Sequence, residues 1–187
     1  MLDCPAGEID AVAMRLMLLR HAKAEKGLPG MGDRERALNP RGRKDAAKIG
    51  AYLVRHALVP DRAVVSSAQR TRETWERLAT ALSAPPPAAF DDRLYNAGPE
   101  LILDVIRETV GAARTLLVIG HNPGLHEAAR LLIAAGDVEA RERLSEGLPT
   151  SGLAVIEFTG SDGRKLQSHG GRLDRFVTPR SLAAATD

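Results

Sequence analysis

The stretch that decides the fold class runs over residues 115–124 and reads TLLVIGHNPG. Its apolar run over 115–119 mixes aliphatic and β-branched residues, which predicts a buried strand. Asn122 and Pro123 then supply an N-cap and a first helical residue, so we expect a helix over 123–135. A strand that leads directly into a helix is the building unit of α/β folds.

The same alternation extends in both directions from this stretch. Short apolar runs predict strands over 16–19, 63–66 and 153–158, with a short strand around Phe90. Apolar residues at helical spacing predict helices over 41–56, 68–82 and 99–110. We therefore expect an α/β fold, a three-layer α/β/α sandwich with a mostly parallel central sheet, built by a single domain over 15–187. Residues 1–14 are expected to form a flexible N-terminal leader, in which Met14 is an alternative start to Met1.

Composition narrows the class of protein. The 187 residues are 44% hydrophobic and 27% charged with a net charge of +2, as in ordinary globular domains. No apolar run is long enough to span a bilayer, and the 3% aromatic content and balanced charge argue against a nucleic-acid partner. Cys4 is the single cysteine, which excludes an intrachain disulfide and favours a reducing cytoplasm.

Basic and histidine side chains stand at three predicted strand ends. Arg20 and His21 follow the first strand, Arg70 lies just after the second, and His121 follows the strand over 115–119. Carboxyl ends of parallel strands meet at one edge of a sheet, where ligands bind. Guanidinium groups bind phosphoryl oxygens in pairs, and histidine acts as nucleophile or proton carrier. The pattern therefore predicts a phosphate site.

Two of these residues, Arg70 and His121, also have an ordinary structural explanation. Arg70 is one of many arginines, and it would stand at the third position of a helix capped by Ser67, where a cation opposes the helix dipole. In the ordinary explanation of His121, this histidine is part of the turn before the next helix, which Asn122 caps. An anion bound at the helix N-termini is the alternative that gives both residues a function.

Three segments together resemble the histidine phosphatase superfamily, in particular its SixA-type phosphohistidine phosphatases. They are Arg20-His21-Ala22, residues 66–74 (SSAQRTRET) and residues 120–125 (GHNPGL), and Leu94-Tyr95-Asn96-Ala97 is similar as well. The resemblance runs in order from about residue 15 to 179. It implies a phosphoglycerate mutase-like fold without a large helical insertion.

The resemblance also implies roles for individual residues. His21 would be a nucleophile that becomes a phosphohistidine, and Arg20, Arg70 and His121 would bind the phosphoryl oxygens. We also expect Asn122 to bind the phosphate. No metal ion and no cofactor is implied. The implied partners are phosphohistidine-bearing proteins, either histidine phosphotransfer domains or phosphotransferase-system proteins, and we expect a monomer.

One departure from the superfamily pattern bears on the substrate. Larger members carry a Glu that protonates the leaving oxygen, whereas residues 91–96 contain only Asp91 and Asp92 as acids. Asp residues at turns are more often local caps than acid catalysts. An imidazole leaving group has a pKa near 6.5, far below that of an alcohol, and needs less acid help. We therefore expect removal of phosphate from phosphohistidine on a protein.

Two alternatives stay open at this stage. A small-molecule phosphomonoesterase of the same superfamily, acting on a sugar or nucleotide phosphate, would share His21 and differ in the pocket walls. A non-catalytic phosphate-binding or phosphoprotein-binding module would need only Arg20, Arg70 and the helix ends. The sequence leaves open the physiological substrate, the oligomeric state, the start codon and whether Asp91 or Asp92 serves as an acid.

Overall fold

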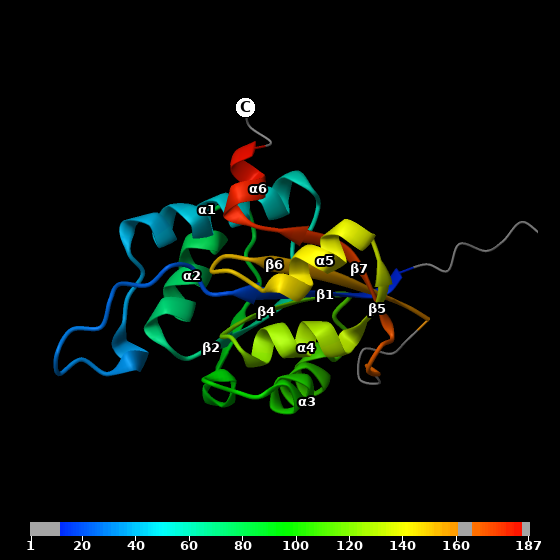
Figure 1. Cartoon of the computed structure of the whole chain (residues 1–187), viewed down its shortest axis with the longest axis horizontal. Coiled ribbons are helices and arrows are strands. Elements are labelled where there is room, and N and C mark those ends of the chain that lie inside the picture. The colour runs from blue at the N-terminus through cyan, green and yellow to red at the C-terminus, as the bar shows by residue number, and fades with distance from the viewer. Residues whose placement is uncertain (1–11, 161–165, 185–187) are drawn as a thin grey trace, which may run out of the picture.

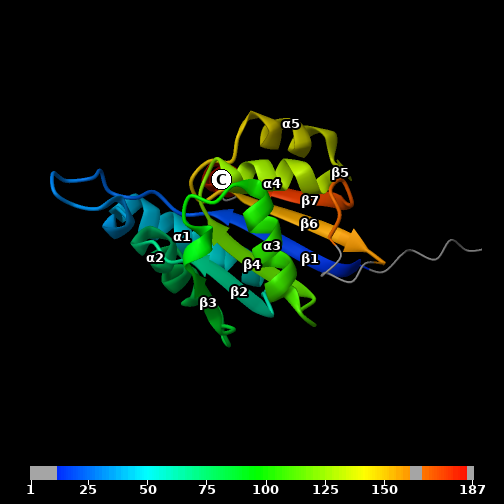
Figure 2. The ribbon, with the colours of Figure 1, turned by 90° about the horizontal axis from the view of Figure 1, so that it is seen from below.

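The computed structural model describes residues 12–160 and 166–184, which form one seven-stranded sheet with helices on both faces (Figures 1 and 2). The strands are β1 (Val12–Arg20), β2 (Arg62–Ser66), β3 (Ala88–Asp91), β4 (Thr115–Gly120), β5 (Ile133–Gly136), β6 (Leu153–Thr159) and β7 (Gly171–Val177). The helices are α1 (Pro40–Arg55), α2 (Gln69–Ala79), α3 (Pro99–Val110), α4 (Gly124–Leu132), α5 (Val138–Glu146) and α6 (Pro179–Ala184), with short 3-10 turns η1 (Asp33–Glu35) and η2 (Asp92–Leu94).

The sheet is mostly parallel, as the alternation of strands and helices predicts. Its order is β3-β2-β4-β1-β6-β7-β5. β6 pairs antiparallel with both of its neighbours, and the other four pairings are parallel. The carboxyl ends of β1, β4 and β2 therefore lie side by side at one edge of the sheet, where the predicted site residues stand.

Two hydrophobic cores lie on the two faces of the sheet, which confirms the three-layer sandwich. In β1, Leu16 and Leu18 pack with α3, α4 and α5, whereas Met17 and Leu19 point to the other side and pack with α1 and α2. All four side chains are fully buried, which explains why this strand is a continuous apolar run. Figure 1 shows α1 and α2 on one side of the sheet and α3 and α4 on the other.

The structure corrects several element boundaries. β1 begins at Val12, so residues 12–14 of the expected leader belong to the strand, with Val12 paired to Thr159 and Met14 buried in the core. The other residues of that leader, 1–11, lie outside the described part of the chain. The helix expected over 123–135 ends at Leu132, because Ile133 turns into β5, which pairs with β7.

Strands β5 and β7 were not expected from the sequence. β5 is only four residues long, too short to show a period. β7 pairs with β6 across a register shift between Val155 and Ile156, and this bulge breaks the alternation of buried and exposed side chains in the sequence.

Glycine at position 50 permits close contact between α1 and α2. A Cβ atom at Gly50 would lie 2.4 Å from the carbonyl oxygen of Leu78. In an unhindered helix, Gly→Ala stabilises by about 1 kcal/mol. Here we expect Gly50→Ala to lower the free energy of unfolding by about 1–3 kcal/mol, because the helices must separate. Urea denaturation would measure this, with Gly27→Ala as a control, since nothing lies closer than 3.7 Å to a Cβ at Gly27. If Gly50→Ala were as stable as the wild type, the close contact between α1 and α2 at this position would be contradicted.

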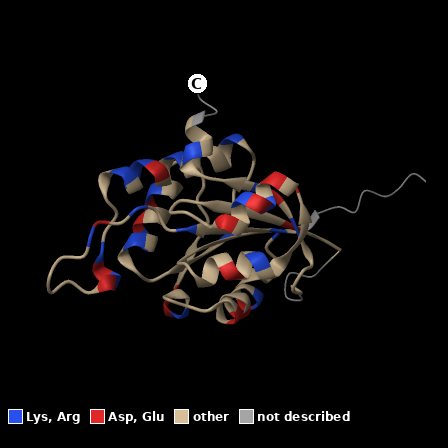
Figure 3. Cartoon of the chain, viewed as in Figure 1, with Lys and Arg blue, Asp and Glu red and all other residues tan. Residues whose placement is uncertain are grey.

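Charges of both signs are interspersed along the helices (Figure 3). Within residues 12–160 and 166–184, no helix is long and apolar enough to cross a membrane.

Candidate functional site

The sheet brings the predicted residues together at the carboxyl ends of β1, β2 and β4. Arg20 is the last residue of β1 and pairs with Gly120 of β4, and the backbone N–H of His21 donates to the carbonyl of Gly120 at 3.1 Å. The rings of His21 and His121 therefore lie close together, with their centroids 5.1 Å apart and their planes at 55°. Arg70 reaches the same place from the start of α2, which follows β2.

The ring of His21 is held in one tautomer. Its Nδ1 lies 2.8 Å from the carbonyl oxygen of Ala22, so Nδ1 carries the proton and donates it, and Nε2 keeps a free lone pair. Burial lowers the pKa of His21 to about 4, partly offset by the bond to Ala22, and the positive charges of Arg70 and Arg20 lower it further. His21 is therefore a neutral imidazole at pH 7, as a nucleophile must be.

The ring of His121 is hydrogen-bonded to two buried side chains, Arg70 and Ser66. Its Nδ1 lies 3.3 Å from the Nη2 of Arg70, which can only donate, so Nδ1 is the acceptor. Nε2 then carries the proton and donates to the hydroxyl oxygen of Ser66 at 2.8 Å. Burial, followed by the charges of His21 and Arg70, lowers the pKa of His121 to about 3. A bound phosphate dianion would favour a proton on Nδ1, where it can be donated to a phosphoryl oxygen.

Asp33 is a part of the site that the sequence patterns did not reveal. Its carboxylate accepts hydrogen bonds from Arg70 Nη2 at 2.9 Å and from the hydroxyl of Tyr95 at 2.8 Å, and its backbone oxygen accepts from Arg70 Nη1 at 2.6 Å. Hydrogen bonds from Arg36 first, and then from Tyr95 and Arg70, hold the pKa of Asp33 well below its usual range. Asp33 thus holds the buried guanidinium of Arg70 in place as a carboxylate.

Arg20 and Asn122 meet on the other side of the site. Arg20 Nη1 donates to the carbonyl oxygen of Leu148 at 2.9 Å, and Asn122 Nδ2 donates to the same oxygen at 2.8 Å. Three buried polar atoms here have no hydrogen-bond partner in the described part of the chain: Arg20 Nε, Asn122 Oδ1 and Ser151 Oγ. Unpaired buried polar atoms are costly, and their clustering points to a ligand or water at this place.

Two expected helix caps are wrong in detail. The N-cap of α2 is Ala68 and not Ser67, so Arg70 is the second helical residue, and the Ser67 hydroxyl donates instead to the carboxylate of Asp92. The N-cap of α4 is Pro123, because the side chain of Asn122 turns away to Leu148. Asn122 therefore stands beside Arg20 without capping the helix.

Asp91 and Asp92 both serve local structure. Asp91 caps η2 by accepting from the backbone N–H of Arg93, and hydrogen bonds from the Arg93 side chain keep the pKa of Asp91 below its usual range. Asp92 is exposed and accepts from Ser67 and Arg34. Neither carboxylate has a hydrogen bond to His21 among the described contacts. The described residues also contain no group of three or more His, Cys, Asp or Glu side chains placed to hold a metal ion.

The two depressed histidine pKa values predict a pH dependence of stability. Their ordinary unfolded value is about 6.5, so as pH falls below 6.5 the unfolded chain takes up protons while native His21 and His121 stay neutral. We expect the free energy of unfolding to decline between pH 6.5 and 4. Proton–nitrogen NMR should show His21 neutral and protonated on Nδ1 at pH 6. A His21 titration near 6.5 would contradict the assignment.

Comparison with known proteins places the chain in a family. The family model described as "Histidine phosphatase superfamily (branch 1)" matches residues 16–97. The crystal structure of SixA from Agrobacterium tumefaciens, a proposed phosphohistidine phosphatase, is 30% identical with a TM-score of 0.76 and covers 90% of this chain and 100% of its own. The uncharacterised protein MT1313 of Mycobacterium tuberculosis is 36% identical over 144 residues, which are 76% of this chain and 88% of that protein.

The chain therefore belongs to the histidine phosphatase superfamily, and its fold is phosphoglycerate mutase-like. Within the superfamily it is similar to the SixA-type structures. SixA of Nakamurella multipartitia, also a proposed phosphohistidine phosphatase, is 29% identical with a TM-score of 0.78, over 91% of this chain and 98% of its own. The segment between β3 and β4 holds only η2 and α3, so no large helical insertion stands there.

Proposed function

We propose that this protein removes phosphate from phosphohistidine on another protein, with His21 as the nucleophile. The observation that carries the proposal is the state of His21, a neutral imidazole whose Nδ1 proton is held by Ala22 and whose Nε2 lone pair is free. Arg70 and His121 lie around it, and Arg20 precedes it at the end of β1. Similarity to the SixA-type structures supports the same substrate class.

In the first step, Nε2 of His21 attacks phosphorus in line with the bond to the substrate imidazole. The new bond is from phosphorus to Nε2, and the bond from phosphorus to the substrate nitrogen breaks, with its electron pair going to that nitrogen. A substrate ring protonated on its other nitrogen leaves as neutral imidazole and needs no further proton. This explains why no carboxylic acid is required beside His21.

During this transfer, charge spreads over the three phosphoryl oxygens. We assign Arg20 and Arg70 as the donors to these oxygens, because guanidinium groups bind phosphoryl oxygens with paired hydrogen bonds. A proton on Nδ1 of His121 would add a further donor. Asp33 accepts a hydrogen bond from Arg70 and holds its guanidinium in position. The free-energy cost of reorganising the site when the phosphoryl group binds is therefore small.

In the second step, water attacks phosphorus and regenerates His21. The phosphorylated ring is an imidazolium that still donates its Nδ1 proton to Ala22, so breaking the phosphorus–Nε2 bond returns the neutral ring. Both protons of the attacking water end on the product, which leaves as dihydrogen phosphate. Atoms and charge balance without a metal ion or cofactor in either step.

The partner we propose is a protein with a phosphorylated, accessible histidine, such as a histidine phosphotransfer domain or a phosphotransferase-system protein, and the proposed location is the cytoplasm. A single-domain monomer would suffice for this activity.

A substrate comparison tests the proposal. Phosphate release would be measured from a phosphohistidine protein, serine phosphate and a sugar phosphate. We expect kcat/KM for the phosphohistidine protein to exceed that for the esters by at least about 10²-fold, since an alcohol leaving group lacks an acid here. Comparable values would overturn the substrate class and favour a small-molecule phosphomonoesterase. Phosphate binding without release from any substrate would favour a binding module.

A further inference from the structure

A groove of about 650 Å³ opens beside Arg20, outside the pair of histidines. It is bounded by the start of α1, the end of α5, the 147–150 loop and the start of α6. Arg20 and Asn122 are among its lining residues, so the groove and the phosphate site share Arg20. A ligand in this groove would lie next to a phosphoryl group held at His21.

The groove carries an excess of positive charge. Four arginines (Arg20, Arg41, Arg143 and Arg180) line it, against two carboxylates (Asp45 and Glu146). Asp45 is already engaged by Arg41, with Nε and Oδ2 3.5 Å apart. Neither Arg143 nor Arg180 has a carboxylate within salt-bridge distance in the part of the chain that the structure describes, and Arg20 Nε is buried without a partner. Cations from three helices thus converge on one space next to the site.

We propose that this groove binds acidic side chains of the phosphohistidine-bearing protein, close to its phosphorylated histidine. The inference rests on the proposed function and adds how the substrate protein is recognised. Carboxylates are the complementary ligands, because arginine binds them in pairs and the exposed Arg143 and Arg180 are free to do so. Pro149, which is exposed, and Pro179, which is half-buried, add accessible apolar surface, which suits a folded protein surface better than a nucleic-acid backbone.

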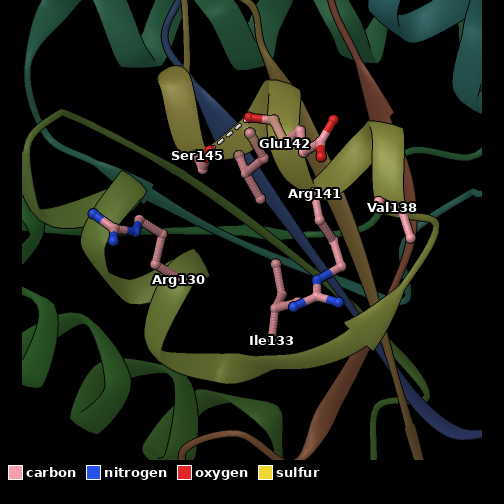
Figure 4. A pocket seen from close by; sticks show the side chains of 7 residues that line it. Arg130, Ile133, Val138, Arg141, Glu142 and Ser145 are labelled. Atoms are coloured by element: carbon pink, nitrogen blue, oxygen red, sulfur yellow. Dashed lines mark hydrogen bonds between the residues drawn. The ribbon is translucent and has the colours of Figure 1, made fainter.

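A second pocket offers a matched control. It has a volume of about 380 Å³ and lies between α4 and α5, with Arg130 and Arg141 on opposite sides of it (Figure 4). Like the pair in the groove, these arginines are exposed and have no salt bridge in the described residues. The pocket shares no lining residue with the histidine site. Removing two charges there changes the net charge equally without altering the groove.

The experiment compares Arg143→Gln/Arg180→Gln with Arg130→Gln/Arg141→Gln. With an acidic phosphohistidine protein as substrate, we expect the groove variant to lower kcat/KM about 5–10-fold, chiefly through KM, and to flatten the dependence of kcat/KM on salt. The control variant should match the wild type. With free phosphohistidine, which brings no acidic side chains of a partner protein, all three proteins should have the same kcat/KM.

The possible outcomes separate the two proposals. Equal losses in the groove variant and in the control would overturn the docking site and leave the proposed function standing. An equal loss on free phosphohistidine would also overturn it, because the groove would then act on the reaction or on a small anionic substrate. Absence of phosphate release from phosphohistidine protein by the wild type, with hydrolysis of an ester, would overturn the proposed function and this inference together.

Discussion

Replacement of His21 by alanine is expected to abolish phosphate release from a phosphohistidine protein, with a loss in kcat of at least about 10³-fold. The reason is that Nε2 of His21 is the proposed nucleophile, and its loss leaves only direct attack by water. Arg20 and Arg70 remain in His21→Ala, since Leu148 and Asp33 hold them independently of the ring. Binding of inorganic phosphate should therefore survive, and isothermal titration would measure it.

His56→Ala is the matched control for this variant. His56 lies at the end of α1, where its ring contacts Tyr52 at a centroid distance of 4.2 Å, and it belongs to no part of the site. It should keep wild-type turnover. If His21→Ala kept a rate within a few fold of the wild type, transfer through His21 would be refuted, while phosphate binding without turnover in both the wild type and the variant would favour a binding module.

Replacement of Arg70 by lysine should lower kcat/KM by about 10²–10³-fold, even though the charge is kept. Arg70 is buried, and its guanidinium contacts Asp33 through two nitrogens while Nη2 also meets His121. A lysine ammonium is a single point charge and cannot span these partners and a phosphoryl group at once. Phosphate release under steady-state conditions would measure the loss, and the affinity for inorganic phosphate should fall with it.

Arg72→Lys controls for a change of arginine on the same helix. Arg72 donates to the backbone oxygen of Ser67 and lies over the ring of Phe90, away from the histidines. It should retain activity within a few fold. Thermal unfolding of both variants would separate loss of function from loss of fold, and an Arg70→Lys protein as active as Arg72→Lys would refute the role given to the guanidinium.

The sequence was sufficient to predict which strand ends meet. Parallel strands place their carboxyl ends at one edge, so Arg20, His21 and His121 had to converge once β1 and β4 were recognised. Arg70 follows by the same argument from β2. The predictions for Arg20, His21 and His121 succeed because each residue lies within two positions of the end of a short apolar run.

Other parts of the site depend on contacts between distant segments. Asp33 begins the short turn η1 after a Gly-rich loop, and its partner Arg70 is 37 residues further along the chain, so no local pattern connects them. Asn122 has a side chain of the type that caps helices, but its Nδ2 donates to the carbonyl of Leu148, and its Oδ1, the atom that would accept at a cap, has no partner in the described part of the chain. The groove beside Arg20 arises only when α1, α5 and α6 are packed together.

Capture of the covalent intermediate would show whether the phosphoryl group passes through His21. The enzyme would be mixed in excess with a ³²P-labelled phosphohistidine protein, quenched in alkali during a single turnover, and separated from the substrate by mass. We predict an acid-labile, alkali-stable label on the peptide that contains His21, which rises and then decays as phosphate appears, and which is absent from His21→Ala. Complete release of phosphate in a single turnover with no label on the enzyme at any time would contradict transfer through His21.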